Sequence, residues 1–394
     1  MNPPERKPSA LGYALLTYMT LVIAAITLIP FEFKLRQHVA FSLRGSLSDV
    51  FENIVLFLPL GFLFHLYRRQ TGWRSVLQAL CFGTLVSAAL ETGQLFLPAR
   101  FPSVLDVAAN GLGAGLGACA AAFQHPQARP ERMSALFALE MPLMNVVYLL
   151  IPLLWLGSLS MDGEVHRLAL MLVLGLFGGS VLASVYTSRR PPDRRRGDFL
   201  PAFYASGWFL LGTLPALASF PLEVLAVSAA VGGAAQLSTR LFRHRNEAER
   251  RFELTTLARV LPLYGLFLLL LSVWPSTLPL GEWSRGLDYK RLTEMERIVF
   301  AARFIEAIAA FTLLGYMVAE MRGRRSESAV KTLTWVTGAS LGFSILTAAV
   351  RDFLAGPLSS VLEAALFTTA ALYGAIIYRL QLAAIQRLQT RGPR

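Results

Sequence analysis

The sequence predicts an all-α fold, a polytopic integral membrane helical bundle of about twelve transmembrane helices. The chain has 394 residues, of which 54% are hydrophobic and only 16% are charged, whereas roughly a quarter of the residues of a soluble domain are charged. The mean hydropathy is +0.50. Apolar runs recur along the whole chain, each of about twenty residues and therefore long enough to cross a hydrocarbon core of roughly 30 Å.

The apolar runs place the helices in chain order. We expect helices at residues 10–30, 50–67, 75–97, 105–123, 135–158, 167–186, 199–219, 221–239, 255–274, 297–320, 331–351 and 359–381. The first run follows Arg6 and Lys7 but has no small-residue cleavage site, so we expect a retained helix and no signal peptide. Cys81 and Cys119 both fall inside apolar runs and are expected to be buried thiols.

The connections between the runs carry the positive charge. The net charge is +12, and Lys and Arg gather in alternate connections, most densely at Arg189 to Arg196 and Arg240 to Arg251. By the positive-inside rule, both termini are predicted to be cytoplasmic. The charge therefore indicates orientation, and we expect no nucleic-acid partner; the basic loops also suit contact with anionic membrane lipids.

Two parts of the chain resemble each other. Shifting residues 52–61 by 254 positions onto residues 306–315 matches at Glu, Ile, Phe, Leu and Gly, and Ser103 to Asp106 corresponds to Ser360 to Glu363. We therefore predict three parts: a four-helix module at 1–128, four further helices of unknown role at 129–253, and a four-helix module at 254–394. The third part is predicted to be a degenerate, parallel repeat of the first, with helices nine to twelve copying helices one to four.

Polar residues gather at the ends of three helices of the first module. They open the second helix, close the third and open the fourth, which places them together on the extracytoplasmic side. Polar groups near hydrocarbon are costly unless they face partners or a wet cavity, so their convergence predicts a pocket. The residues are Asp49, Glu52, Asn53, Glu91, Gln94, Arg100, Asp106 and Asn110.

A structural interpretation of the same residues stays open. Asp49 and Asp106 suit helix N-termini as caps, and Arg100 can pair with Glu91 as a clamp. Glu91 differs because it stands near a helix C-terminus, where the helix dipole disfavours a carboxylate. It is therefore the first catalytic candidate, with Asp106 the second.

For the other candidate residues, the sequence favours a structural role over a chemical one. The run Gly111, Gly113, Gly115 and Gly117 has small residues at i and i+4, which predicts close helix approach and no phosphate loop. In the tenth helix Arg303 and Glu306 are expected to neutralise each other. The five histidines are scattered without a ligand spacing, so no metal or cofactor is expected.

The polar motifs resemble those of the VanZ-like family of bacterial membrane proteins over about residues 10–124. They read Asp49-x-x-Glu52-Asn53-x-x-x-Phe57-x-Pro59-x-Gly61, then Glu91-x-x-Gln94-x-x-x-Pro98-x-Arg100, then Asp106-x-x-x-Asn110-x-x-Gly113-x-x-x-Gly117. The resemblance implies a four- to five-helix module of the bacterial cytoplasmic membrane, in a family named for a protein that raises teicoplanin resistance and linked to the cell envelope. It implies no settled reaction, and Ser103 stands where the family often has an aspartate.

The leading hypothesis is that the pocket binds, or modifies, a lipid-linked envelope molecule at the extracytoplasmic leaflet. The expected ligand is a polyprenyl-linked glycan, a cell-wall precursor or a glycopeptide target. Glu91 and Asp106 would act as acid or base, and substrate-binding residues would be Asp49, Asn53, Gln94, Arg100 and Asn110. The alternatives are a transporter or flippase, and a non-catalytic scaffold of an envelope-polymer assembly complex; whether the protein is an enzyme stays open.

Overall fold

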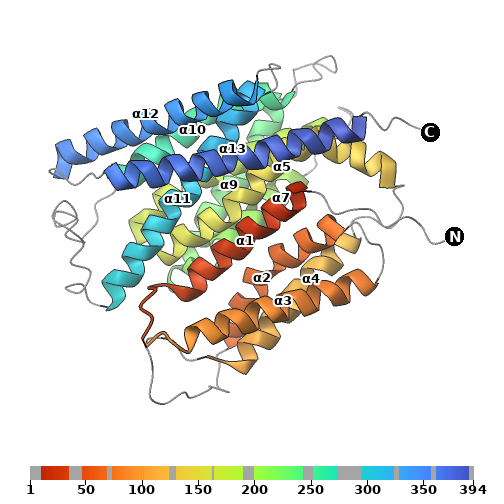
Figure 1. The fold of residues 1–394 in the computed structure, drawn as a ribbon. Helices are drawn as coiled ribbons and strands as arrows, with labels where there is room; N and C mark the ends of the chain where they lie inside the picture. Colours follow the sequence, from red (N-terminus) through yellow and green to blue (C-terminus); the bar gives the residue numbers. More distant parts are fainter. Residues whose placement is uncertain are drawn as a thin grey trace. The chain divides into compact units, whose positions relative to one another are not determined.

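The computed structural model describes most of the chain and places helices along it. The described residues are 10–34, 47–68, 73–98, 100, 102–123, 130–161, 164–189, 199–242, 252–273, 294–323, 328–355 and 361–389. Within these ranges every regular element longer than an isolated bridge is a helix (Figure 1). The all-helical class predicted from the apolar runs is confirmed.

The helices follow the predicted order closely. They are α1 Ala10–Leu28, α2 Leu47–Arg68, α3 Trp73–Gln94, α4 Val104–Phe123, α5 Pro130–Leu159, the 3-10 turn η1 Val165–Arg167, α6 Leu168–Arg189, α7 Leu200–Gly212, α8 Leu214–Ser219, α9 Pro221–Phe242, α10 Phe252–Val273, α11 Glu294–Gly323, α12 Ala329–Ala355 and α13 Val361–Gln389. The chain forms two compact units. Unit 1 comprises residues 1–135 and 383–394, and unit 2 comprises residues 136–382.

In unit 1, α4 packs against α2 through glycines that bring the two backbones together (Figure 1). A Cβ atom added to Gly113 would lie 2.2 Å from the carbonyl oxygen of Ile54, and one added to Gly117 would lie 1.9 Å from that of Leu58. Gly61 of α2 is equally close to Ala114 of α4. No larger residue fits at these glycines between the helices. α2 and α4 run parallel, because Ile54 contacts Gly113 and Leu58, four residues later, contacts Gly117.

The next face of α4 packs against α3. A Cβ atom on Gly111 would lie 2.2 Å from Thr84 Oγ1, and one on Gly115 would lie 3.3 Å from Leu80 Cδ1. The pairs run in opposite order, so α3 is antiparallel to α4. The glycine run thus serves two neighbours, which agrees with its predicted packing role.

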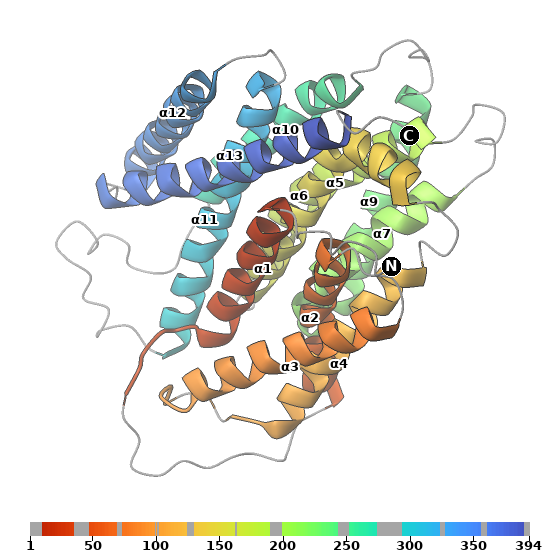
Figure 2. The ribbon, with the colours of Figure 1, turned by 45° about the vertical axis from the view of Figure 1, so that its right-hand side comes forward.

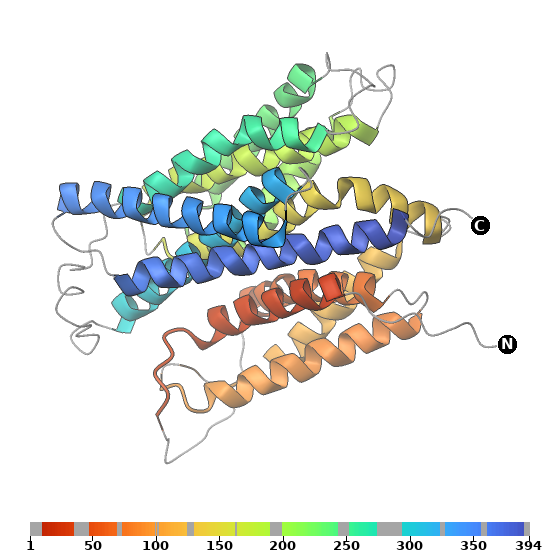
Figure 3. The same cartoon turned by 45° about the horizontal axis from the view of Figure 1, so that its top comes forward.

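Helix α1 completes unit 1 by packing on α2 and α3 (Figure 3). Its side chains Met19 and Ile23 are buried. Beyond the helix, the backbone N–H of Lys34 donates to the carbonyl of Phe96 at 2.7 Å. This bond connects the segment that follows α1 to the segment that follows α3.

Unit 2 is built on α6, which contacts α9 and α10, while α7 packs on α9 and α12 packs on α10 and α11 (Figure 2). Two buried aromatic side chains connect helices of unit 2 by donating a hydrogen bond to a backbone carbonyl of another helix. Trp208 Nε1 donates to the carbonyl of Val147 at 3.3 Å, and the Tyr264 hydroxyl donates to that of Ala310 at 2.6 Å.

The helix expected at 199–219 is broken into α7 and α8. The break falls at Thr213, with φ −108° and ψ 19°, two residues before Pro215. Proline cannot donate the next helical hydrogen bond and its ring clashes with the preceding turn, so the chain restarts the helix. The Thr213 hydroxyl satisfies the Phe209 carbonyl at 2.8 Å.

A second glycine-mediated crossing lies within unit 2, between α11 and α13. A Cβ atom on Gly315 would lie 1.9 Å from the carbonyl oxygen of Ala371, and one on Gly374 would lie 1.9 Å from that of Thr312. These contacts correspond to Gly61 with Ala114 and Gly117 with Leu58, at the shifts of 254 and 257 positions used to align the two parts. Both crossings bring the backbones of two helices into contact.

Arg303 and Glu306 of α11 bond to other helices. Arg303 pairs with Glu164 and Glu306 with Arg167. The charges of Arg303 and Glu306 also interact with each other, as expected. Each in addition has an ion-pair partner outside α11, which the sequence did not indicate.

The described helices support a membrane protein. Seven of them are long and apolar enough to span a membrane, and three shorter apolar stretches lie at Tyr13–Leu28, Val146–Leu159 and Thr256–Ser272. Cys81 is exposed on α3 and Cys119 is partly exposed, so neither is buried as expected. Both sit on helix faces that the protein itself leaves uncovered.

Several predictions fall outside the described residues. They concern nearly all of the dense basic connections at Arg189 to Arg196 and Arg240 to Arg251. The three-part division of the chain also stays a prediction.

Candidate functional site

The directions of α2, α3 and α4 bring the predicted polar residues to one end of unit 1. Parallel packing of α2 and α4 places their N-termini together, and antiparallel α3 brings its C-terminus to the same place. Asp49 lies in the first turn of α2 and Asp106 in the first turn of α4, while Glu91 lies in the last turn of α3. We call this group the outer polar cluster; it consists of Asp49, Asn53, Glu91, Arg100, Ser103 and Asp106.

Glu91 ties α3 to the start of α4. Its Oε2 accepts the backbone N–H of Ser103 at 2.9 Å, and its side chain is buried. Ser103 is the N-cap of α4, because its carbonyl accepts the first helical bond, from Val107, at 3.4 Å. The local reason for a carboxylate at this helix C-terminus is therefore an unpaired N–H at the neighbouring helix N-terminus.

Asp106 is released from a capping role by this bond. It is the third residue of α4, where a carboxylate commonly accepts the N–H of the N-cap residue. Here Glu91 takes that N–H. The half-buried Asp106 carboxyl group instead interacts with the Asn53 side chain and with the charges of Asp49 and Arg100.

Arg100 supplies the positive charge of the outer polar cluster. A turn closed by its own N–H to the Leu97 carbonyl, at 3.2 Å, holds it in the connection between α3 and α4. Burial lowers the pKa of its guanidinium, and the charges of Glu91 and Asp106 oppose that shift. Arginine remains protonated in proteins, so one cation faces two carboxylates.

Two predicted binding residues have structural partners outside the outer polar cluster. Gln94 Nε2 donates to the Thr27 carbonyl of α1 at 3.2 Å. Asn110 is buried one turn deeper, where its Nδ2 donates to Ser87 Oγ at 2.8 Å. Its Oδ1 has no hydrogen-bond partner within the described part of the chain.

Sequence reasoning missed the part played by Ser103, which was noted only as a lost carboxylate. Its contribution is a backbone N–H, and every residue except proline carries one. The residue type at position 103 could therefore not have predicted this contact. Among the described residues no three His, Cys, Asp or Glu side chains gather as a metal ion would require.

The arrangement can recognise a polar group that has both hydroxyls and negative charge. Asp49, Asp106 and Asn53 can accept or donate hydrogen bonds, and Arg100 can pair with an anion. The spans Trp73–Gln94 and Val104–Ala122 end and begin beside these residues. The outer polar cluster therefore lies at the edge of the membrane-crossing segments.

Comparison with known proteins bears on this module. No curated protein and no solved structure matches the chain. The model of the VanZ/LLP1 family matches residues 8–125, so the N-terminal module, which carries the outer polar cluster, is VanZ-like.

Proposed function

We propose that the VanZ-like module binds the polar head of a lipid-linked cell-envelope molecule at the extracytoplasmic leaflet. The observation that carries the proposal is the position of Arg100 among Asp106, Asp49 and Asn53 at the edge of the spans. A head group containing sugar and phosphate would find hydrogen-bonding groups for its hydroxyls and a cation for its phosphate there, while the lipid tail remained beside the helices. The ligand class is a polyprenyl-linked glycan or cell-wall precursor, and a glycopeptide target would share these features.

In an enzymatic form of the proposal, Asp106 serves as the general acid or base. It is half-buried, is not used as a cap, and has a second carboxylate and a cation close to it. Glu91 instead holds the start of α4 through Ser103, and is therefore a positioning residue. The geometry thus favours Asp106 over Glu91 as the group that touches the ligand.

The test is the lipid that remains bound to the full-length protein after gentle purification. We expect mass spectrometry to identify a polyprenyl-linked species bound to the parent chain, and Arg100→Gln and Asp106→Asn to lower its occupancy about tenfold, because each removes a charged hydrogen-bonding group. Thr92→Ala is the matched control, since Thr92 is exposed on α3 and bonds only to the Ala88 carbonyl of its own helix in the described contacts. Equal lipid occupancy in the parent protein and the three variants would contradict the proposal.

The repeated glycine crossing favours the second candidate, a transporter or flippase. We infer that α10–α13 form a degenerate copy of α1–α4, because two backbone contacts recur at the same sequence shifts. With twelve spans and cytoplasmic termini, two such modules would resemble transporters built from parallel repeats. Movement of a labelled polyprenyl lipid between leaflets of reconstituted vesicles would establish this candidate; binding without movement would favour the first, and a scaffold would show neither.

A further inference from the structure

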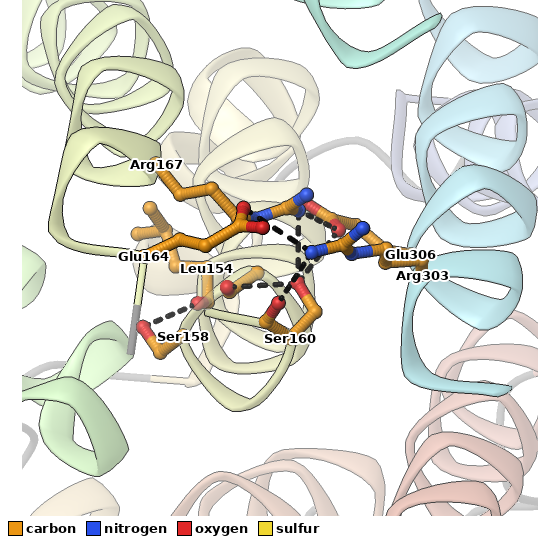
Figure 4. A network of polar contacts seen from close by, with 8 residues as sticks. Leu154, Ser158, Ser160, Glu164, Arg167, Arg303 and Glu306 are labelled. Carbon is orange, nitrogen blue, oxygen red and sulfur yellow. Dashed lines mark hydrogen bonds and ion pairs between the residues drawn. The ribbon is translucent and has the colours of Figure 1, made fainter. Parts of the chain in front are cut away.

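Unit 2 contains a buried group of charges that the VanZ-like module does not include. It lies where the end of α5, the turn η1 and the first half of α11 meet (Figure 4). We call it the inner charged cluster, after its burial. It consists of Ser160, Glu164, Arg167, Arg303 and Glu306.

One layer of the inner charged cluster is completely enclosed. Arg167 Nη2 and Glu306 Oε2 are 2.8 Å apart, and their side chains are 1% and 0% exposed. The Ser160 hydroxyl lies between them, 2.9 Å from Arg167 Nη2 and 3.1 Å from Glu306 Oε2. Gly157 makes room for the carboxylate, since a Cβ atom there would lie 2.9 Å from Glu306 Oε1.

The other layer is looser and reaches solvent. Arg303 Nη2 and Glu164 Oε2 are 3.3 Å apart, with side chains 14% and 16% exposed. Arg303 also reaches the Ser160 carbonyl at 3.5 Å, at the limit of a hydrogen bond. The longer distance and the partial exposure make this pair the weaker of the two in the cluster, so an anion can displace Glu164 from Arg303 more readily than Glu306 from Arg167.

Both arginines of the inner charged cluster have an unsatisfied donor. Nε of Arg303 and Nε of Arg167 are both buried and have no hydrogen-bond partner in the described part of the chain. Buried donors are normally satisfied, and a guanidinium group that retains an unsatisfied N–H beside a second N–H can pair with an oxyanion such as phosphate. Of the two arginines only Arg303 is partly exposed, so it is the one that a ligand can reach.

The depth of the inner charged cluster matches a phosphate at the membrane surface. Arg167 lies in the first turn of the span Val165–Thr187, and Arg303 lies in the first turn of the span Ala301–Arg322. Ser160 follows directly after the apolar stretch Val146–Leu159. Three apolar segments therefore start or stop here, at the level of lipid head groups.

We propose that the inner charged cluster is an anion site that binds a phosphate group. The phosphate replaces Glu164 on Arg303, which donates through Nε and Nη2, while the enclosed Arg167–Glu306 pair keeps its place. Glu164 turns to water and becomes the charge that competes with the ligand. The site belongs to unit 2 alone and does not depend on the function proposed for the VanZ-like module.

The test measures phosphate and phospholipid binding to the purified full-length protein. One arm titrates inorganic phosphate against protein in neutral detergent, and the other measures phosphatidylglycerol retention in phosphatidylcholine nanodiscs. We expect Arg303→Gln to weaken binding at least about tenfold, because a charged hydrogen bond is lost. Glu164→Gln is expected to strengthen it several-fold, because the competing carboxylate is removed.

Matched variants separate local from general charge effects. Glu223→Gln removes one negative charge from the exposed start of α9, and Lys331→Gln removes one positive charge from the exposed start of α12. Neither is expected to change binding more than about twofold. Opposite effects of Arg303→Gln and Glu164→Gln in either arm support the site, and the arm in which they occur identifies a soluble phosphate or a lipid head group. Parallel losses in both variants, or no binding in either arm, overturn it.

Discussion

Glu91 and Ser103 show how one buried bond positions the residues around it. The carboxylate accepts the backbone N–H that starts α4, and this leaves Asp106 free to face Asn53 and Arg100. Glu91 was expected to be the first catalytic candidate because of its place near a helix C-terminus. Its contact explains that place by structure, and the chemical candidate moves to Asp106.

This contact gives a prediction at the residue scale. Glu91→Ala leaves the Ser103 N–H buried without an acceptor and should lower the free energy of unfolding by about 1–3 kcal/mol. Ser103→Ala should change it much less, because the donor is a backbone group. Thermal unfolding in detergent measures both variants, with Glu91→Gln as the control that keeps an acceptor oxygen. Equal destabilisation by Ser103→Ala and Glu91→Ala would contradict the assignment.

At the scale of elements, glycines decide which helices meet. On α4, Gly113 and Gly117 face α2, and Gly111 and Gly115 face α3. The four-residue spacing was visible in the sequence and correctly indicated packing. The identity of each partner was not, because small residues permit a close approach without specifying which helix makes it.

The two glycine crossings predict matched effects. Gly117→Ala and Gly374→Ala each place a Cβ atom 1.9 Å from a carbonyl oxygen of the neighbouring helix. We expect each to destabilise the protein by about 1–3 kcal/mol or more through overpacking.

Gly338→Ala on α12 is the control for these two variants, because nothing lies within 4 Å of its added Cβ atom. It should be neutral or stabilising by up to about 1 kcal/mol, since alanine favours helix. Melting temperatures in one detergent compare the three. A Gly374→Ala protein as stable as Gly338→Ala would argue against the crossing of α11 and α13.

At the scale of the whole molecule, two compact units divide the polar chemistry. Unit 1 holds the outer polar cluster at three helix ends, and unit 2 encloses the Arg167–Glu306 pair. At the shift of 254 positions, Glu306 corresponds to Glu52. In the described structure Glu306 pairs with Arg167, a residue outside the proposed copy.

Membrane topology supplies a prediction at this scale. The alternation of basic connections predicts twelve spans with both termini in the cytoplasm. Green fluorescent protein fused after Arg394 should therefore fluoresce, whereas alkaline phosphatase at the same place should be inactive. The reverse result is expected for fusions after Leu97, on the opposite side. An active phosphatase after Arg394 would contradict the predicted orientation.

The sequence by itself determined the membrane class, the order of the helices and the gathering of polar residues at three helix ends. These follow from hydropathy, run length and helical spacing, which are properties of short stretches of chain. It also placed Pro215, although the resulting break at Thr213 was not anticipated. Its polar motifs were sufficient to indicate the VanZ-like module.

Only the tertiary structure decided the partners. Glu91 bonds to a backbone N–H that any residue could supply, and Glu306 bonds to Arg167, 139 positions away, instead of to nearby Arg303. Pairing depends on which helix faces pack together, and apolar faces in a membrane differ too little in sequence to specify that choice. The same reason separates the outer polar cluster, whose members the sequence named, from the inner charged cluster, which only the packing of α5, α6 and α11 brought together.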